Sequence, residues 1–544
     1  MSLLSKENGW ALLAGLSCVA GFAPFGIFPI PVAALAVLFA LWCRADTPRA
    51  AAHLGFAFGL GLFVAGIGWI YVALHDFGGM PIWLAAPATL LFSAFLALFP
   101  ALAGYLQAQI NVKFAQRFAR SSPSLRGGER SEGAIGKGES EARKSGHASV
   151  VLVMPGAWVL IEWLRGMIFT GFPWLTLGYA HSDSPLAGYA PLLGAYGVSL
   201  AAALSAGLLA YLSINLLRDS KTALRSTRLR AALLVLVALW AGGELLRKVA
   251  WTQPDGEPFS VTLIQGNIGQ DVKFDDEELA GTLETYRRLV MQNPAKLTVL
   301  PETAFPVMRD EVPQSLAEQL RDHAKRNGGD LLVGVFERDR RGYYNSVIAL
   351  GASEDGFASE QPHYRKHHLV IFGEFIPLRP VFGWLINEVL HIPMGDLARG
   401  DERQAPLNVA GQRVAVNICY EDVFGEEIIM ALPAATLLVN VTNDGWYGNS
   451  HAAAQHNQIS QLRALETGRM MLRATNTGVT SIIGVNGRVL QQLPQHQQAV
   501  LQGQVQGYQG TTPYVRWGNL AVLLLIALML AGAGWLMRKT SLKD

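Results

Sequence analysis

The chain has 544 residues, of which 51% are hydrophobic and only 16% are charged, and its mean hydropathy is +0.25. Because a soluble globular chain usually carries about 25% charged residues, this composition argues against a fully soluble protein and indicates segments shielded from water. Two of the three cysteines, Cys18 and Cys43, lie in apolar segments, which argues against a disulfide framework and leaves Cys419 as a lone thiol in a polar context. The net charge of +2 identifies no partner.

Long apolar runs separated by short polar links occupy the first 251 residues, and one more run closes the chain. The runs cover residues 10–21, 31–43, 53–73, 82–108, 150–169, 186–217, 229–249 and 517–537. Runs of about 20 residues match the thickness of the hydrocarbon core of a bilayer. The first two runs are shorter, so they form either two tilted spans or one re-entrant hairpin, and we prefer two spans. The sequence therefore predicts a multi-pass α-helical membrane domain of about eight spans.

Lysine and arginine are distributed unevenly among the links. They precede the first run and follow the second, fourth, sixth and last runs, whereas the links at residues 21–30, 74–81 and 170–185 contain neither. The positive-inside rule then places both termini in the cytoplasm, together with a disordered loop at residues 121–149. Residues 171–175 form a nearly uncharged segment rich in aromatic side chains, which would lie at the membrane interface or line the entrance for an acyl chain. With seven spans before it, the segment after residue 251 lies on the outer face, which is the periplasm in a Gram-negative cell.

Residues 254–513 have the composition of a soluble α/β domain. Predicted strands cover residues 260–265, 297–301, 331–336, 345–350, 414–418, 436–441 and 479–484, and predicted helices cover residues 276–292, 313–326, 426–432 and 451–472. This alternation predicts a mostly sequential sheet with helices packed on it. We therefore divide the chain into a membrane domain at 1–251, a catalytic domain at 252–514, and a last span with a cytoplasmic tail at 515–544.

Polar side chains follow three of the predicted strands directly. Glu302 follows residues 297–301, Cys419 follows residues 414–418, and residues 442–446 follow the strand at 436–441. Strand ends of one sheet meet in one crevice, so these groups are expected to be neighbours, and a helix dipole after Cys419 would favour a thiolate. With Lys366 they form a candidate set of base, nucleophile and cation for acyl transfer.

Each of these residues also has a structural interpretation. Glu302 is alternatively a cap, Lys366 a solvated lysine, and Cys419 a small buried hydrophobe. A zinc site at the histidines of residues 363–368 is disfavoured, since no second cluster at ligand spacing follows. The acidic residues after Cys419 are most simply favourable charges at a helix start; they are Glu421, Asp422, Glu426 and Glu427.

Several motifs of the C-terminal half together resemble the nitrilase/amidase superfamily. They are residues 301–304 (PETA), 364–370 (YRKHHLV) with 372–374 (FGE), and 417–421 (NICYE). With membrane helices on both sides, the whole chain except residues 121–149 resembles the bacterial apolipoprotein N-acyltransferase family, and residues 266–268, 399–400, 442–446 and 473–478 add to the likeness. The resemblance implies an inner-membrane protein whose α/β domain is a nitrilase-like α-β-β-α sandwich in the periplasm.

The resemblance also implies a reaction in two halves. The Cys419 thiol would attack an ester of a phospholipid, typically phosphatidylethanolamine, and the resulting thioester would pass its acyl chain to the α-amino group of the N-terminal S-diacylglyceryl cysteine of an apolipoprotein. This would be the last step of lipoprotein maturation. The family implies no cofactor, no metal and no nucleic acid, and we expect a monomer.

The family's motifs assign a role to each matching residue. Glu302 would be the general base, and Lys366 with the backbone N–H of Tyr420 would stabilise the oxyanion. Glu374 and Glu421 would support these groups. Asn345 and Trp446 would line the substrate pocket.

Some residues depart from the family pattern, and this puts the shape of the pocket in question. They are Gly269, Phe274 and Ile371, where many members carry Pro, Trp and Pro. Residues 378–392 are apolar and form either a mobile arm at the membrane interface or an ordinary buried helix, and we prefer the arm.

Two rival functions remain: another nitrilase-like enzyme, and a protein of a different class. A membrane-bound nitrilase-like amidase would release ammonia from a small amide and produce no lysophospholipid. A non-catalytic scaffold or transporter is disfavoured by the scarcity of charge within the apolar runs.

Overall fold

The computed structural model describes residues 5–121, 148–218, 226–351, 362–371, 373–376 and 396–541. The predicted loop at residues 121–149 lies outside this described part except for its first residue and its last two, and the predicted arm at residues 378–392 lies outside it entirely. The chain divides into two compact units, one made of Met1–Gly68, Pro87–Lys248 and Asn519–Asp544, and the other of Trp69–Ala86 and Val249–Gly518. The domain boundaries that we predicted from composition differ from this division mainly in residues 69–86.

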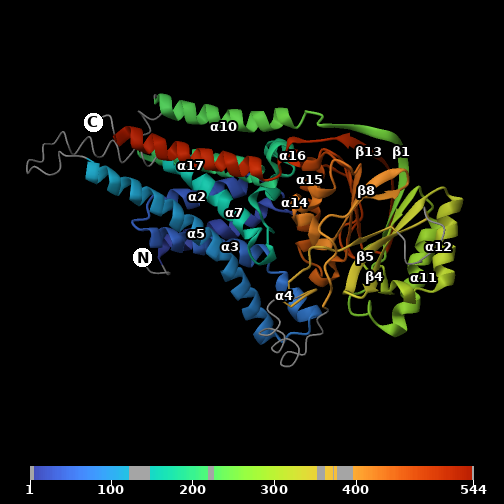
Figure 1. Ribbon diagram of the computed structural model, residues 1–544. Helices are drawn as coiled ribbons and strands as arrows, with labels where there is room; N and C mark the ends of the chain where they lie inside the picture. Colours follow the sequence, from blue (N-terminus) through green and yellow to red (C-terminus); the bar gives the residue numbers. More distant parts are fainter. Residues whose placement is uncertain are drawn as a thin grey trace, which may run out of the picture. The chain divides into compact units, whose positions relative to one another are not determined.

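The first unit is helical (Figure 1). Within the described residues, its α-helices are α1 (Lys6–Cys18), α2 (Pro29–Trp42), α3 (Pro48–Gly66), α5 (Ile82–Ser121), α7 (Met154–Arg165), α8 (Ala190–Arg218), α10 (Thr227–Leu246) and α17 (Leu520–Ser541). Of α5, the first five residues belong to the second unit. Each of the eight apolar runs therefore overlaps one of these helices. The run at residues 53–73 differs most, because α3 starts at Pro48 behind the Thr47 cap and ends at Gly66.

Four of the described helices are long and apolar enough to cross a membrane, and they cover Pro48–Gly66, Ile82–Val112, Pro185–Arg218 and Thr227–Leu246. Pro29–Trp42 and Leu520–Leu536 are shorter apolar helices. Large apolar side chains remain exposed along α10, where Leu234 is 68% exposed and Val237 is 57% exposed. Water-facing surfaces rarely carry such continuous apolar faces, so these helices fit the multi-pass membrane domain that the sequence predicted.

The second unit contains two β-sheets. The first sheet has the order β13-β1-β2-β4-β5-β6, with β3 paired to β4, and the second has the order β12-β11-β10-β9-β8-β7. The strands of the first sheet are β1 (Thr252–Gln265), β2 (Leu297–Val299), β3 (Phe305–Met308), β4 (Asp330–Asp339), β5 (Gly342–Leu350), β6 (His363–Arg365) and β13 (Ala499–Gly510). Those of the second are β7 (Leu407–Val409), β8 (Gln412–Ile418), β9 (Leu437–Thr442), β10 (Met471–Thr475), β11 (Ser481–Ile483) and β12 (Val489–Gln492).

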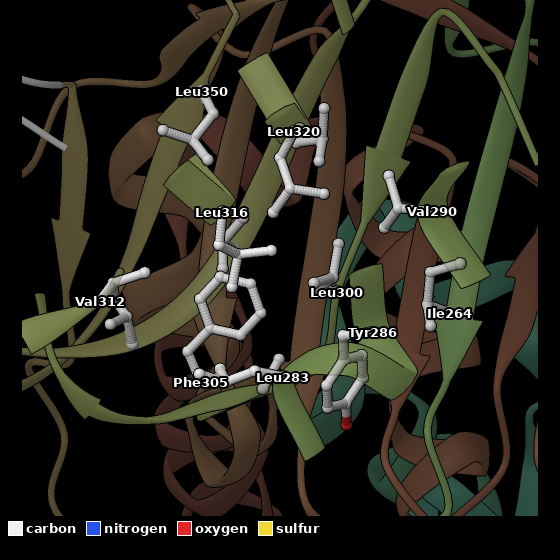
Figure 2. Packing of buried hydrophobic residues seen from close by; sticks show 14 of the residues in the cluster. Ile264, Leu283, Tyr286, Val290, Leu300, Phe305, Val312, Leu316, Leu320 and Leu350 are labelled. Carbon is white, nitrogen blue, oxygen red and sulfur yellow. The ribbon is translucent and has the colours of Figure 1, made fainter. Parts of the chain in front are cut away.

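Helices cover the outer face of each sheet (Figure 1). The helices α11 (Asp276–Gln292) and α12 (Gln314–Arg326) pack on the first sheet through a buried cluster that includes Tyr286, Leu316 and Leu350 (Figure 2). The short α14 (Gly425–Ile428) and the long α15 (Ala452–Thr467) pack on the second sheet around Leu438. The unit is therefore an α-β-β-α sandwich, which confirms the fold class that the resemblance implied.

Two sequence expectations for this unit were wrong in detail. Two sheets form instead of one, because strand-length apolar runs do not specify which strands pair. The predicted helix at residues 451–472 ends at Thr467, where Gly468 adopts a left-handed conformation with φ 64° and closes the helix. Residues Met471–Thr475 then form β10, whose five side chains are all buried.

The loop Trp69–Ala86 contacts the α/β unit directly. It contains the one-turn α4 (Ile70–Val72), and the indole N–H of Trp69 donates to Gln455 Oε1 at 3.3 Å. The Trp69 ring also meets the Tyr447 ring edge-on at 4.5 Å between centroids. A segment that hydropathy assigned partly to a membrane span therefore belongs to the unit that holds the predicted catalytic residues. The short α16 (Pro513–Trp517) ends the same unit.

Candidate active site

Cys419 directly follows β8 and is the first residue of a 3₁₀ turn, Cys419–Val423. Its φ is +54°, a left-handed value that side chains other than glycine rarely adopt, and the side chain is buried. Strained residues of this kind are typical of sites where the backbone must present one side chain in a fixed direction. The Asn440 side-chain amide donates a hydrogen bond to the Cys419 carbonyl at 3.1 Å, which stabilises the turn.

The surroundings of Cys419 raise the pKa of its thiol, whereas the predicted helix dipole would have favoured the thiolate. Burial raises the pKa of Cys419, and the negative charges of Glu302 and Asp444 raise it further, whereas the charge of Lys366 and a hydrogen bond with Thr442 lower it. The expected dipole is weak, because a 3₁₀ turn and the one-turn helix α14 replace the predicted continuous helix. A base is therefore needed to take the thiol proton during an attack.

Glu302 follows β2 and is buried in a set of donors. Its Oε1 accepts from the Asn345 amide at 2.7 Å and from Lys366 Nζ at 3.4 Å, and its Oε2 accepts from the backbone N–H of Asn443 at 2.8 Å. Asn443 directly follows β9 of the second sheet. The carboxylate therefore bridges the ends of strands from both sheets, and its charge acts on the Cys419 thiol.

Lys366 follows β6, which runs in the same direction as β2 because β4, β5 and β6 pair in two antiparallel steps. Its side chain is only 1% exposed, and its Nζ contacts Glu374 Oε1 at 2.8 Å as well as Glu302. Burial alone would lower the pKa of Lys366, but the charges of Glu374 and Glu302 raise it well above its usual value. Lys366 is therefore a permanent cation held between two carboxylates.

Glu421 connects the lysine segment to the cysteine turn. Its Oε1 accepts from the backbone N–H groups of His367 at 2.7 Å and His368 at 3.0 Å, and its Oε2 accepts from Ile418 N–H at 2.6 Å and the Tyr364 hydroxyl at 2.9 Å. Burial raises the pKa of Glu421 to about 7, against the opposing effect of these backbone donors. Glu421 therefore positions both Lys366 and Cys419 through their neighbours, and it is not a simple helix-start charge.

The comparisons with known proteins agree along nearly the whole chain. The family described as the apolipoprotein N-acyltransferase N-terminal domain matches residues 14–208, and the carbon-nitrogen hydrolase family matches residues 260–514. An apolipoprotein N-acyltransferase of Nitrosomonas europaea is 49% identical over 523 residues, which cover 96% of this chain and 95% of that protein. The chain belongs to the apolipoprotein N-acyltransferase family.

Two further members of that family are similar over most of their length. Those of Ralstonia nicotianae and Chromobacterium violaceum are 44% and 42% identical, with 96% of this chain covered in each case and 92% and 93% of the relatives. The family membership confirms the resemblance seen in the motifs. Together with the apolar helices, it makes the chain an integral membrane protein whose α/β unit is of the carbon-nitrogen hydrolase type.

The remaining predicted site residues are Asn345, Tyr420 and Trp446. Asn345 is buried and donates to both Glu302 and, at 3.5 Å, Glu374, so its nitrogen organises the carboxylates. The ring of Tyr420 packs edge-on against Phe424 at 5.3 Å between centroids. Trp446 lies just beyond β9 and is 42% exposed.

Behind the cysteine turn lies a buried ionic network that includes a residue we misread. Asp422 was interpreted as a helix-start charge, but it is fully buried and accepts from His456 Nε2 at 2.8 Å and Arg473 Nη1 at 3.2 Å. His456 Nδ1 and Arg473 Nη2 reach the two oxygens of Asp444 at 3.0 and 3.1 Å. Two carboxylates thus face one guanidinium and one imidazole, and His456 Nε2 also lies 3.3 Å from the Cys419 carbonyl.

Sequence reasoning missed the roles of Lys273, His456 and Arg473. Arg473 carried a readable signal, because a charge inside an apolar strand must find a buried partner. Lys273 and His456 carried none, since a lysine in a polar loop and a histidine on a helix are usually exposed to solvent.

Proposed function

We propose that this protein transfers a fatty acyl chain from a phospholipid, through a thioester on Cys419, to the α-amino group of the N-terminal S-diacylglyceryl cysteine of apolipoproteins. The observation that carries the proposal is the convergence of Glu302, Lys366 and Cys419 in one buried site of a chain that matches the acyltransferase family from end to end. The name of these relatives favours this reaction over the amidase alternative.

In the first half-reaction the Cys419 sulfur forms a bond to the ester carbonyl carbon while its proton passes to Glu302. The carbonyl electrons move to oxygen, and the resulting oxyanion is stabilised by Lys366 and the Tyr420 backbone N–H. The tetrahedral intermediate then breaks its bond to the alcohol oxygen. That oxygen takes the proton from Glu302, and a lysophospholipid leaves.

In the second half-reaction the free α-amino group of the acceptor attacks the thioester. Glu302 accepts a proton from the amine, the carbon–sulfur bond breaks, and the sulfur recovers its proton. Glu374 and Glu421 position Lys366 and the cysteine turn, while Asn345 and Trp446 contribute to the pocket. Both substrates are lipid-anchored, so a catalytic unit attached to membrane helices meets them at high local concentration.

The location that we propose follows from the charges of the links. The α/β unit would lie in the periplasm of a bacterial inner membrane, with both termini in the cytoplasm. Phosphatidylethanolamine is the proposed donor, and a monomer is the proposed functional form. Cysteine labelling at the links with membrane-impermeant reagents would test this orientation directly.

The function is tested by intact-protein mass spectrometry after purification from membranes. We expect a mass increment of one fatty acyl group that is lost on hydroxylamine treatment and absent from Cys419→Ala. Cys43→Ala is the matched control, because that cysteine is exposed and far along the chain from the site, and it should keep the increment. N-acylation of a diacylglyceryl peptide by pure Cys419→Ala at the wild-type rate would refute the proposal.

A further inference from the structure

A second lysine is buried at the candidate site, and no role has been assigned to it above. Lys273 lies in the loop between β1 and α11 and is 2% exposed. Its Nζ donates to the main-chain carbonyl of Glu302 at 3.0 Å. An ammonium carries three N–H donors. Within the described part of the chain, this neutral oxygen is the one hydrogen-bond acceptor found for the Lys273 ammonium.

The loop that carries Lys273 is held against the site. The backbone N–H of Ile268 donates to Asn476 Oδ1 at 2.9 Å, and the Asn476 amide returns a bond to the Ile268 carbonyl at 2.8 Å. Gln270 accepts from the Asn443 amide at 2.7 Å, next to the backbone N–H that binds Glu302. The lysine is therefore fixed near the reacting groups by residues of the second sheet.

The two lysines differ in what surrounds their charge. Lys366 contacts the carboxylates of Glu302 and Glu374, so its charge is already compensated in the resting site. Lys273 contacts a neutral oxygen, and its Nζ lies 6.0 Å from the centre of the Phe274 ring. Burial lowers the pKa of Lys273 to about 8, against the opposing charge of Glu302. A buried ammonium without a direct ion pair is costly, and such groups are characteristic of functional sites.

We infer that Lys273 is a further catalytic residue, whose ammonium stabilises the negative charge that forms on the carbonyl oxygen of the acyl group. This inference rests on the proposed acyl transfer. Before attack, Glu302 and Glu374 balance the two lysines. When the thiol proton has passed to Glu302, the oxyanion and Glu374 balance them, so the charge of the four protein groups and the acyl oxygen stays at zero.

Lys273 keeps its proton throughout this sequence. The sulfur–carbon bond forms, the proton of sulfur moves to Glu302, and the oxyanion accepts hydrogen bonds from Lys273 until the ester carbon–oxygen bond breaks. Without Lys273 the same groups would carry one uncompensated negative charge both before attack and in the intermediate, and in the intermediate the acyl oxygen would lack the ammonium as a hydrogen-bond donor. Because the site is buried, that charge would be poorly screened by water.

The test compares Lys273→Met, Lys273→Arg and the wild type as full-length protein in detergent micelles. Single-turnover acylation of Cys419 is followed by intact mass with two donors, phosphatidylethanolamine and a p-nitrophenyl ester of the same acyl chain, which has no phosphate. We expect Lys273→Met to slow the saturated acylation rate about 10²–10³-fold with both donors, as for loss of one oxyanion donor. Lys273→Arg keeps the positive charge and should recover at least part of this loss.

The controls separate the possible failures. Lys325→Met removes an exposed lysine of α12 and should acylate at the wild-type rate. Wild-type protein that forms no acyl-enzyme would overturn the proposed function itself. If the wild type is acylated, the Lys273 inference alone is overturned by an unchanged rate in Lys273→Met, by a loss confined to the phospholipid donor, which would indicate a headgroup phosphate site, or by a change in KM without a change in rate.

Discussion

The two sheets of the α/β unit contribute to the candidate site in different ways. The first sheet supplies Glu302 and Lys366, which form an ion pair, and the segment after β6 supplies Glu374, which also pairs with Lys366. The second sheet supplies Cys419 on a strained turn that rests on the buried network of Asp422, Asp444, His456 and Arg473. In the proposed reaction, the first sheet therefore provides the proton acceptor Glu302 and the fixed charges around it, and the second sheet holds the nucleophile in place.

The largest effect is expected from the first sheet. Glu302→Gln keeps the size of the side chain but removes the group that accepts the thiol proton, so acylation of Cys419 should slow about 10²–10⁴-fold. The melting temperature should change little, because Lys366 keeps Glu374 as a partner. The measurement is single-turnover acylation by intact mass. A rate within tenfold of wild type would assign the proton to another base and break the division between the sheets.

On the second sheet, Arg473→Met should act on stability. Asp422 and Asp444 would lose the guanidinium between them, and a buried ion network broken on one side typically costs about 3–5 kcal/mol. Thermal unfolding of the purified protein in detergent measures the loss. Arg488→Met removes an exposed arginine and should cost less than about 0.5 kcal/mol. Equal melting temperatures for the two variants would contradict a supporting role for the network.

His456 gives the same network a dependence on pH. Burial and the charge of Arg473 lower the pKa of His456, but Asp422 and Asp444 outweigh them and the pKa is raised above its usual value of 6.5. A raised histidine pKa stabilises the fold fully below pH 6.5, and this contribution is lost as the pH rises through the folded-state pKa.

The melting temperature of the wild type should therefore fall as the pH rises above neutrality. His456→Gln should show a shallower fall, and the difference in slope is at most about 1.4 kcal/mol per pH unit because one proton is involved. Thermal unfolding of both proteins between about pH 6 and pH 9 provides the comparison. Parallel curves would mean that His456 is neutral in the folded protein.

The smallest effect is expected at the exposed edge of the site. Trp446 is 42% exposed, and Trp446→Phe keeps an aromatic ring there, so the KM for the phospholipid should rise less than tenfold, or by less than about 1.4 kcal/mol. The saturated acylation rate should stay at the wild-type value, since no reacting atom is touched. A fall in that rate with constant KM would place Trp446 at the reacting centre instead of the pocket wall.

Local patterns in the sequence determined much of this protein. Hydrophobic runs specify the helices of the membrane unit and seven of the strands, because burial requires apolar side chains at the period of each element. Polar residues directly after such strands identified Glu302 and Cys419, and the motif around Lys366 completed the set. These features depend on neighbours in the chain, so they can be read before any fold is known.

Only the tertiary structure decided which sheet each group comes from and what each charge contacts. Asp422 reads as a helix-start charge, yet its partners His456 and Arg473 lie 34 and 51 residues further along the chain. Lys273 reads as a loop lysine, yet it is buried beside Glu302, 29 residues away. Burial and ion pairing depend on segments that come together only when the strands pair. A pattern of neighbouring residues does not specify which distant segments will be in contact.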